Sequence, residues 1–325
     1  MFKATWEKTS ATHELPHGMV EKMLGLAYPN KKLISHELIA GGCANLNIKF
    51  LLEDAKQPLI LRIYLRDNEA ALREQKLAEL LKATVPVPLT HYIGEFEKYH
   101  FAITEFMPGL TLRDLLLGDA PYNLGEVMYE VGVILAKITK HEFDKSGFFD
   151  KNLNITDKLT DCFALTFAKE CLHNPNVCSM LDIATISEIT VYFSKYTNLL
   201  SNTHEKSLVH GDFDPANILV EQQNGKWKVS AVLDWEFAFS NSVLHDVASM
   251  LRYAHKMPPE FQDAFLKGLT DSGLMLPENW YIIVTLLNLL SLLDCLKRSD
   301  TKNRPSQSKD ILELIEHILL ELRNA

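Results

Sequence analysis

The sequence predicts an α+β protein of two parts: a β-rich N-terminal part with an antiparallel sheet and one main helix, and a mostly helical C-terminal part with a small hairpin. β-rich runs lie within residues 32–65, where polar or glycine turns separate them, and again within residues 89–106. Apolar residues at helical spacing dominate the chain after that point. A Pro-Gly pair at residues 108–109 separates the two patterns, so we expect a division into residues 1–106 and 107–325.

The N-terminal part is expected to begin with a short helix over residues 18–26. An amphipathic helix is expected over residues 69–82, because its leucines and alanines recur at helical spacing. The prolines within residues 85–88 end it, since proline cannot continue a helix. Strands are expected before and after this helix, over residues 32–40, 46–52, 58–65, 89–95 and 100–106.

The C-terminal part contains two short β runs, residues 216–220 and 227–234, on either side of Asn224-Gly225, which is a strong hairpin signal. Strands and helices do not alternate along the chain, so a doubly wound parallel sheet is not expected. The remaining segments show helical periodicity, and we expect helices over residues 110–117, 124–141, 157–172, 185–201, 243–256, 258–270, 277–297 and 308–323.

Composition excludes several classes of protein. The 325 residues are 47% hydrophobic, enough for a sizeable core. The net charge is -9 and no cluster of Lys and Arg is present, so we expect no nucleic-acid partner. The five cysteines form no Cys-x-x-Cys pair, which favours a reducing compartment. The N-terminus lacks the apolar run of a signal peptide, and the longest apolar stretch, residues 281–293, is shorter than a membrane span. We therefore expect a cytoplasmic protein without a membrane partner.

The clearest chemical signal is the run HGDFDPANIL at residues 210–219. It has the form H-x-D-x-x-x-x-N, which is the spacing of kinase catalytic loops. Asp212 is expected to orient and deprotonate an acceptor hydroxyl. Asn217 is expected to offer its amide oxygen to Mg²⁺, a cation that prefers oxygen ligands. The run therefore predicts phosphoryl transfer from ATP.

A second carboxylate follows the hairpin. Asp234 comes directly after the apolar strand of residues 231–233. At this position it is expected to chelate Mg²⁺ between the β- and γ-phosphates, where the metal neutralises developing charge. The loop motif alone could arise by chance, but the loop and Asp234 together make chance a poor explanation.

The runs HGDFDPANIL and VLDWE, followed by the run HDVA at residues 245–248, resemble the aminoglycoside phosphotransferase and choline kinase superfamily. The resemblance covers residues 35–300. It implies a bilobal protein-kinase-like fold, with a nucleotide-binding N-terminal lobe and an acceptor pocket in the C-terminal lobe. It also implies ATP and Mg²⁺ as cofactors and a small-molecule hydroxyl as acceptor, on an aminoglycoside, an amino alcohol or a sugar.

The N-terminal lobe offers further candidates for nucleotide binding. Gly41, Gly42 and Asn45 lie in a turn whose backbone N–H groups could face phosphate, although a Gly-Gly turn in a plain hairpin is equally common. Arg62 is a lone cation in an apolar strand, and a buried cation needs a partner. Glu74 on the following helix is the natural partner, and the pair would grip the phosphates. The alternative for Arg62 is an ordinary surface arginine on an edge strand.

The strand of residues 101–106 and the following residues 107–109 resemble the hinge between the lobes. The Glu105 carbonyl and the Met107 amide are then the groups that bind the adenine edge. On the late helix, Trp280, Tyr281 and Asp294 are candidates for the acceptor pocket, with core packing or a solvated face as the favoured alternative.

Other residues refine the prediction. His210 is expected to hold the loop backbone and Asp246 to anchor the loop by hydrogen bonds, whereas Asp214 is assigned no role. Gly211 replaces the arginine of protein kinases, and only a short stretch separates Asp234 from Asp246. A small acceptor is therefore favoured over a protein. A nucleotide-binding module without catalysis is the alternative of a different class, and a protein kinase is the least favoured.

Overall fold

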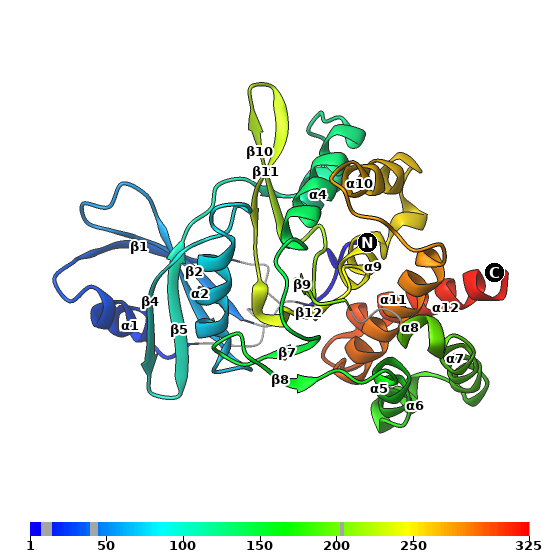
Figure 1. The fold of residues 1–325 in the computed structure, drawn as a ribbon. Helices are drawn as coiled ribbons and strands as arrows, with labels where there is room; N and C mark the ends of the chain where they lie inside the picture. Colours follow the sequence, from blue (N-terminus) through cyan, green and yellow to red (C-terminus); the bar gives the residue numbers. More distant parts are fainter. Residues whose placement is uncertain (8–14, 40–44, 202–204, 325) are drawn as a thin grey trace.

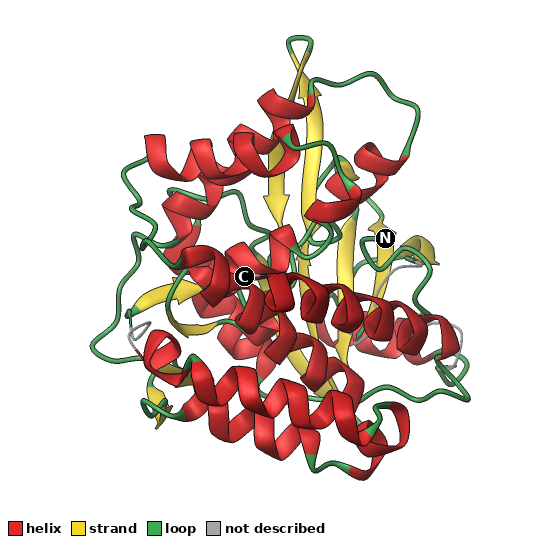
Figure 2. Ribbon diagram, turned by 90° about the vertical axis from the view of Figure 1, so that its right-hand side faces the viewer, coloured by secondary structure: helices red, strands yellow, loops and turns green. Residues whose placement is uncertain are grey.

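The computed structural model describes residues 1–7, 15–39, 45–201 and 205–324, and it has the two parts that the sequence predicts (Figure 1). A five-stranded sheet with two helices lies at one end of the molecule. A larger, mostly helical part with two small sheets lies at the other end. In Figure 2, most helices gather in front of the strands, on the side of the molecule that faces the viewer.

The sheet of the N-terminal part is antiparallel, with strand order β1-β2-β3-β5-β4. Burial alternates along the second strand, as the two-residue period of a strand requires. Helix α1 (Met19–Ala27) packs on the face that carries these buried residues, and α2 (Ala70–Leu81) packs on the other face. The strands are β1 (Leu33–Leu38), β2 (Leu46–Leu52), β3 (Leu59–Tyr64), β4 (Thr90–Phe96) and β5 (Tyr99–Glu105).

The helical part contains two small sheets. One joins β6 (Leu110–Thr111) to the hairpin of β10 (Ile218–Gln223) and β11 (Lys226–Val232). The other has the order β8-β7-β12-β9, with β7 (Gly147–Phe149), β8 (Ile155–Lys158), β9 (Ser207–Val209) and β12 (Phe239–Asn241). The helices are α3 (Leu112–Leu117), α4 (Leu124–Ile138), α5 (Phe163–Leu172), α6 (Pro175–Met180), α7 (Ile183–Lys195), α8 (Thr197–Ser201), α9 (Leu244–Leu251), α10 (Glu260–Asp271), α11 (Trp280–Lys297) and α12 (Pro305–Asn324), with short 3₁₀ turns at Trp235–Phe237 and Ala254–Lys256.

Helix α11 forms the centre of the helical part. By length and composition it could cross a membrane, with a mean hydropathy of 1.5, but 61% of it is buried inside the protein. It packs on α5, α6, α9 and α12, and side chains such as Leu286, Leu289 and Leu293 have no exposed surface. The apolar sequence of this helix is therefore explained by its place in the core.

Some short elements differ from the expectation. The five strands β6, β7, β8, β9 and β12 and helix α6 were not predicted, because segments of two to six residues show no clear period. Strand β8 occupies the start of the helix expected over residues 157–172, which begins only at Phe163. The helix expected over residues 185–201 ends at Lys195, since Tyr196 leaves the helical conformation with φ -105° and ψ 15°.

The first residues lie with the helical part. Phe2 and Trp6 are buried in its core, and the N-terminus lies beside α9 in Figure 1. The division at residue 106 stays a prediction, but it assigns residues 1–7 to the part of the protein on which they do not pack.

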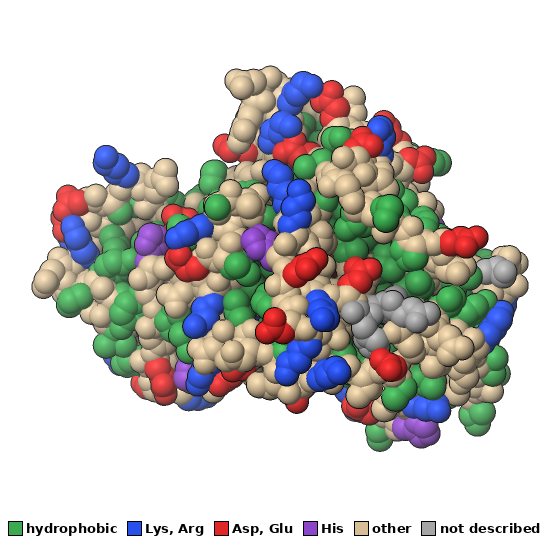
Figure 3. Space-filling view, in the orientation of Figure 1, with side chains coloured by type: hydrophobic (Ala, Val, Ile, Leu, Met, Phe, Trp, Pro, Cys, Tyr) green, Lys and Arg blue, Asp and Glu red, His purple; other side chains and the backbone are tan. Residues whose placement is uncertain are grey.

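The surface carries both signs of charge. On the face that Figure 3 shows, acidic and basic side chains of the described residues are interspersed rather than gathered into one area. Such a mixed surface is typical of a solvated protein. The expected lack of a nucleic-acid partner stays a prediction.

Candidate active site

The loop of residues 210–217 connects β9 to β10, and one buried carboxylate holds its backbone. Asp246, near the start of α9, accepts hydrogen bonds from the backbone N–H groups of His210 at 2.7 Å and Gly211 at 2.9 Å. Asp246 has no exposed surface, and this burial raises its pKa to about 7. The anchoring role that the sequence predicts for Asp246 is confirmed.

The His210 side chain uses both ring nitrogens to hold the backbone. Its Nε2 lies 2.8 Å from the carbonyl oxygen of Leu233, and its Nδ1 lies 3.2 Å from the N–H of Asp212. Because Nδ1 accepts from that N–H, Nε2 carries the proton and donates to Leu233. Burial lowers the pKa of His210, which favours this neutral ring. The predicted structural role of His210 is therefore confirmed.

Gly211 adopts a conformation that leaves no room for a side chain. Its φ is +83°, and a Cβ atom would lie 2.3 Å from the carbonyl oxygen of Phe237. An arginine, which the sequence analysis contrasted with this glycine, cannot fit here without moving the backbone.

The side chain of Asn217 is fixed against Asp212. Its Nδ2 donates to the backbone oxygen of Asp212 at 2.9 Å and to Oδ2 of the same residue at 3.1 Å. This orientation turns Oδ1 of Asn217 away from Asp212, where it can face a cation. The backbone oxygen of Asn217 accepts from the N–H of Leu233 at 2.8 Å, so the loop also lies against the residue that precedes Asp234.

Asp234 lies between the catalytic loop and the sheet. It follows β11 in a left-handed conformation, with φ 68° and ψ 62°, and its carboxylate contacts the guanidinium of Arg62. Arg62, on β3, also lies 3.2 Å from Oε1 of Glu74 on α2. The expected contact between Arg62 and Glu74 is present, and Asp234 joins it. Burial opposes the charge of Arg62, but the two carboxylates hold its pKa well above the ordinary value.

Asn45 and Glu236 connect the sheet to the helical part. Nδ2 of Asn45 donates to Oε2 of Glu236 at 2.9 Å, and Oδ1 of Asn45 accepts from the N–H of Leu65 at 3.3 Å. Burial and the nearby carboxylate of Asp234 raise the pKa of Glu236 to about 7. The predicted phosphate-facing turn itself cannot be placed here, since Gly41 and Gly42 lie outside the described residues.

The predicted hinge follows β5. Glu105 ends this strand, and its carboxylate accepts from the N–H of Leu89 at 3.0 Å. Met107 follows in an irregular connection and is half-buried. Within the described part of the chain, the Met107 N–H donates to no other group, so it is available to a ligand. The roles of Glu105 and Met107 in nucleotide binding stay predictions.

Lys3 is a component of the site that sequence reasoning missed. Its Nζ lies 2.7 Å from Oδ1 and 3.0 Å from Oδ2 of Asp212, and 2.5 Å from Oδ2 of Asp214. Burial alone would raise the pKa of Asp212, but the ammonium of Lys3 outweighs it and holds that pKa below its ordinary value. The separation of 209 residues between Lys3 and Asp212 leaves no local pattern that could reveal the contact.

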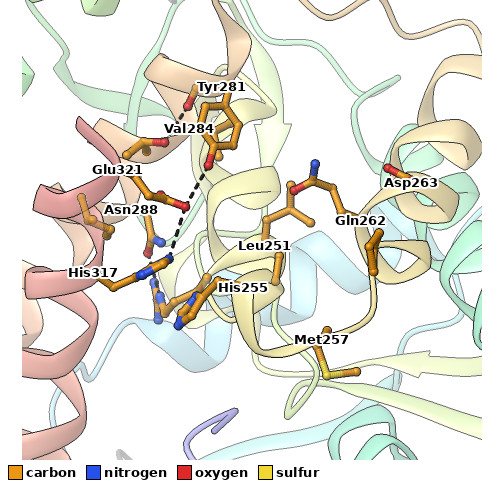
Figure 4. Close-up of a pocket in the computed structure, with 15 residues that line it drawn as sticks. Leu251, His255, Met257, Gln262, Asp263, Tyr281, Val284, Asn288, His317 and Glu321 are labelled. Carbon is orange, nitrogen blue, oxygen red and sulfur yellow. Dashed lines mark hydrogen bonds and ion pairs between the residues drawn. The ribbon is translucent and has the colours of Figure 1, made fainter. Parts of the chain in front are cut away.

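A cavity of about 300 Å³ opens among the end of α9, α11 and α12 (Figure 4). Arg252, which follows α9, lines it with only 4% of its surface exposed. Its guanidinium donates to Oδ1 of Asn288 and Oγ of Ser291, both at 2.9 Å. No carboxylate of the described residues lies within ion-pair distance of Arg252, although its charge contributes to the lowered pKa of Asp212.

The three residues predicted to line the acceptor pocket have different surroundings in the structure. Tyr281 lines the cavity, and its hydroxyl donates to Oε1 of Glu321 at 2.9 Å. Asp294 pairs instead with the side chain of Arg298 at 2.5 Å. Trp280 packs edge-on against Tyr281, with the ring centroids 5.6 Å apart.

The oxygen groups near the loop fit a magnesium ion that is also coordinated by the phosphates of a nucleotide. Within residues 1–7, 15–39, 45–201 and 205–324, no three His, Cys, Asp or Glu side chains cluster as a protein-only metal site. Asn217 and Asp234 supply one amide oxygen and one carboxylate. Mg²⁺ is commonly held by one or two protein groups, with phosphate oxygens and waters completing its coordination.

These elements together define a kinase-like phosphotransferase: a fixed aspartate on a loop, an asparagine and a second aspartate beside it, and an arginine–glutamate pair from the sheet. The model of the phosphotransferase enzyme family (APH) matches residues 35–280, and the chain belongs to this family. No curated protein matches the chain.

Solved structures share the fold. A thermostable mutant of aminoglycoside phosphotransferase APH(4)-Ia, in a ternary complex with AMP-PNP and hygromycin B, aligns with a TM-score of 0.71 and 19% identity, over 92% of this chain and 97% of that one. The GDP complex of aminoglycoside 2'-phosphotransferase-IIIa aligns with a TM-score of 0.70 and 17% identity, over 93% of this chain and 98% of that one. Macrolide 2'-phosphotransferase MphH from Brachybacterium faecium aligns with a TM-score of 0.63 and 13% identity, over 91% of this chain and 98% of that one. At these identities, the similarity shows the protein-kinase-like APH fold.

Proposed function

We propose that this phosphotransferase moves the γ-phosphate of ATP to a hydroxyl group of a small molecule with the help of Mg²⁺. The observation that carries the proposal is the contact between Asn217 and Asp212. It fixes the predicted base and turns an amide oxygen outward, on a loop whose backbone Asp246 holds. A protein that only bound nucleotide would not require a carboxylate fixed in this way.

In the proposed reaction, Asp212 orients the acceptor hydroxyl and takes its proton as the oxygen attacks phosphorus. The new O–P bond forms while the bond from the γ-phosphorus to the bridging oxygen of ADP breaks. Asn217 and Asp234 would hold Mg²⁺, which when bound neutralises charge on the phosphates. The low pKa of Asp212 keeps its carboxylate ionised and able to accept a hydrogen bond from the hydroxyl.

In this proposal, Arg62 contacts carboxylates before the nucleotide binds and phosphate oxygens afterwards. In the structure its guanidinium contacts Asp234 and Glu74 together. Phosphate oxygens of a nucleotide would compete for the same guanidinium, because arginine binds phosphate and carboxylate through the same donors. Binding of the nucleotide would then free Asp234 for the cation, so that the two ligands would enter together.

We further propose that the acceptor occupies the cavity beside α9 and α11. Its volume of about 300 Å³ suits a small molecule, and it is bordered by Arg252, whose charge acts on Asp212. The aminoglycoside and macrolide enzymes with this fold support an acceptor of small-molecule size. Their low identity to this chain does not select among amino alcohols, aminoglycosides, macrolides and sugars.

A protein acceptor is disfavoured by the segment after Asp234. The 3₁₀ turn Trp235–Phe237, strand β12 and helix α9 follow one another directly, and most of their side chains are buried. A loop that could be ordered by phosphorylation has no place between them. Together with the closed space around Gly211, this favours a site that is formed without activation.

A screen for ADP release tests the proposal. Purified protein with Mg²⁺ and ATP is offered amino alcohols, aminoglycosides, macrolides and sugars, and the phosphorylated product is identified by mass spectrometry. Asp212→Asn should keep nucleotide affinity but lose turnover by at least about 100-fold, because the carboxylate is needed only in the transition state.

Asp119→Asn is the matched control, since Asp119 is exposed on a turn after α3. It should leave turnover unchanged. Wild-type turnover in Asp212→Asn would contradict the mechanism. Tight nucleotide binding without ADP release across the whole panel would favour the non-catalytic alternative.

A further inference from the structure

The N-terminal segment, residues 1–7, is built into the core of the helical part. Phe2 is 1% exposed. Its ring packs edge-on against Tyr253, with the centroids 5.3 Å apart, and at a tilt against Phe261, with the centroids 6.0 Å apart. Trp6 is 6% exposed, and its Nε1 donates to Oδ2 of Asp310 at 2.8 Å. Burying two aromatic side chains favours folding. The segment is therefore part of the fold rather than a loose cover.

Two further features fix the backbone of this segment. The carboxylate of Glu7 accepts from the N–H groups of Ser306 at 2.8 Å and Gln307 at 3.1 Å, in the first turn of α12. Phe2 and Lys3 both have left-handed backbones, with φ of 51° and 57°. Such conformations are unfavourable for residues other than glycine and persist where surrounding contacts determine them. Here they direct the Lys3 side chain toward the catalytic loop while the Phe2 side chain enters the core.

The Lys3 ammonium is shared by two carboxylates of the catalytic loop. The side chains of Lys3, Asp212 and Asp214 are 14%, 23% and 6% exposed. Two carboxylates that lie this close and this far from water repel each other unless a cation lies between them. Asp214 is also held by the N–H of Ala216, which donates to its Oδ1 at 2.8 Å. The fixed carboxylate of Asp214 therefore holds the Lys3 ammonium, and Lys3 in turn can position the carboxylate of Asp212.

We propose that Lys3 is a positioning residue of the phosphotransfer site, whose ammonium bridges Asp212 to Asp214 and so holds the Asp212 carboxylate where the acceptor hydroxyl must arrive. This rests on the function proposed above, in which Asp212 is the base. Lys3 and Asn217 hold the carboxylate from two sides. Each carboxylate oxygen has two acceptor positions, so a lone pair is left for the hydroxyl.

The proposal also restricts the acceptor. Lys3 neutralises only one of the two negative charges, but it already contacts both carboxylates, so an ammonium group of an acceptor at Asp212 or Asp214 would lie beside the Lys3 ammonium and be repelled by it. A positively charged group next to the reacting hydroxyl is therefore disfavoured. A charged group of the acceptor would bind farther from the loop.

Three variants test the role of Lys3. Lys3→Ala and Lys3→Met should lower kcat by about 10- to 100-fold, the range expected for a misplaced reacting group, with the KM for ATP changed less than about twofold. Lys3→Arg should retain more activity than Lys3→Met, because it keeps the charge. Lys31→Ala is the matched control: Lys31 belongs to an exposed pair with Asp54 at 3.6 Å, and its removal should change nothing.

Rescue by added amine distinguishes positioning from a purely structural role. Methylammonium or ethylammonium should restore part of the kcat of Lys3→Ala in a saturable way, because the small cation can enter the vacated position. The same amines should have no such effect on the wild type or on Lys31→Ala. Thermal melting and nucleotide affinity of each variant show whether it is folded.

Several results would overturn the proposal for Lys3. A folded Lys3→Ala with wild-type kcat, or with a loss that no amine repairs, would make the contact structural only. An increase in kcat would identify the segment as an inhibitory cover instead. If the wild type transfers no phosphate to any acceptor, the proposed function fails on its own account. Ethylammonium should still raise the melting temperature of Lys3→Ala but not of Lys3→Ala combined with Asp212→Asn, and no difference between them would refute the bridge.

Discussion

Replacing Arg62 with methionine removes the cation that Glu74 and Asp234 share between the two parts of the protein. The side chain of Arg62 is 12% exposed, and those of Glu74 and Asp234 are 14% and 27% exposed. Removing one partner of a buried ion pair costs about 3–5 kcal/mol, because the remaining charge stays buried without compensation. We expect the free energy of unfolding of Arg62→Met to fall by that amount at pH 8.

The size of this loss should depend on pH. Burial raises the pKa of Glu74, and burial together with Asp234 raises the pKa of Glu236 to about 7. Without Arg62, both values rise further. These groups carry more negative charge at pH 8 than at pH 5, and they take up protons in the folded protein as the pH falls, which removes their mutual repulsion. At pH 5 the loss in Arg62→Met should therefore shrink to about 1–2 kcal/mol.

Urea unfolding at pH 8 and pH 5 measures both values. Arg298→Met is the matched control, because Arg298 pairs with Asp294 at the surface and their side chains are 45% and 29% exposed. An exposed pair contributes at most about 1 kcal/mol, and we expect no change in this contribution between the two pH values. An equal loss in Arg62→Met at pH 5 and pH 8 would refute the electrostatic reasoning and assign the effect to packing.

Two further predictions concern the loop and its support. Gly211→Ala should destabilise the protein by about 2–4 kcal/mol and abolish turnover, since its Cβ would meet the Phe237 carbonyl 2.3 Å away; thermal melting and ADP release check this, and a stable, active variant would contradict it. His245 packs against Phe239, and burial lowers its pKa to about 4, below the value near 6.5 of an unfolded histidine. Its neutral form therefore favours folding above pH 6.5, and this advantage, at most about 3 kcal/mol, is lost as the pH falls to 4. His245→Phe should lack that loss, which urea unfolding at several pH values measures. If the unfolding free energies of the wild type and His245→Phe change in parallel between pH 7 and pH 4.5, the predicted contribution of His245 is wrong.

The elements that sequence reasoning predicted are those whose signal lies within a short stretch of chain. Helix α11 is apolar over most of its 18 residues, α12 shows a helical period over 20, and β2 alternates over seven. Strands β7, β9 and β12 have three residues each, and they exist because partner strands far along the chain complete them. No local sequence pattern predicts such pairing.

The same limit separates the site residues. Asp212, Asn217 and Asp234 lie within one hairpin unit, so their spacing carries the chemistry. Arg62 and Glu74 were paired because a buried cation requires an anion and the next helix supplies one. Lys3 and Arg252 act through contacts that only the folded helical part creates. Which of the chain's charged side chains are buried near Asp212 depends on the fold, and the linear sequence does not show it.

The position of residues 1–7 affects the order in which the molecule can be completed. Synthesis proceeds at about 5–20 residues per second, so roughly 15–60 s pass between the appearance of Trp6 and that of Asp310, its partner on α12. Phe2 lacks its ring partners until Tyr253 and Phe261 are made, and Trp6 lacks Asp310 for the whole interval, so both side chains are available to chaperones or to each other until then. The segment that carries Lys3 gains the contacts of Trp6 and Glu7 only when α12 arrives. An unfinished chain that already contains the whole motif of residues 210–219 would therefore still lack part of the support for Lys3, which contacts Asp212.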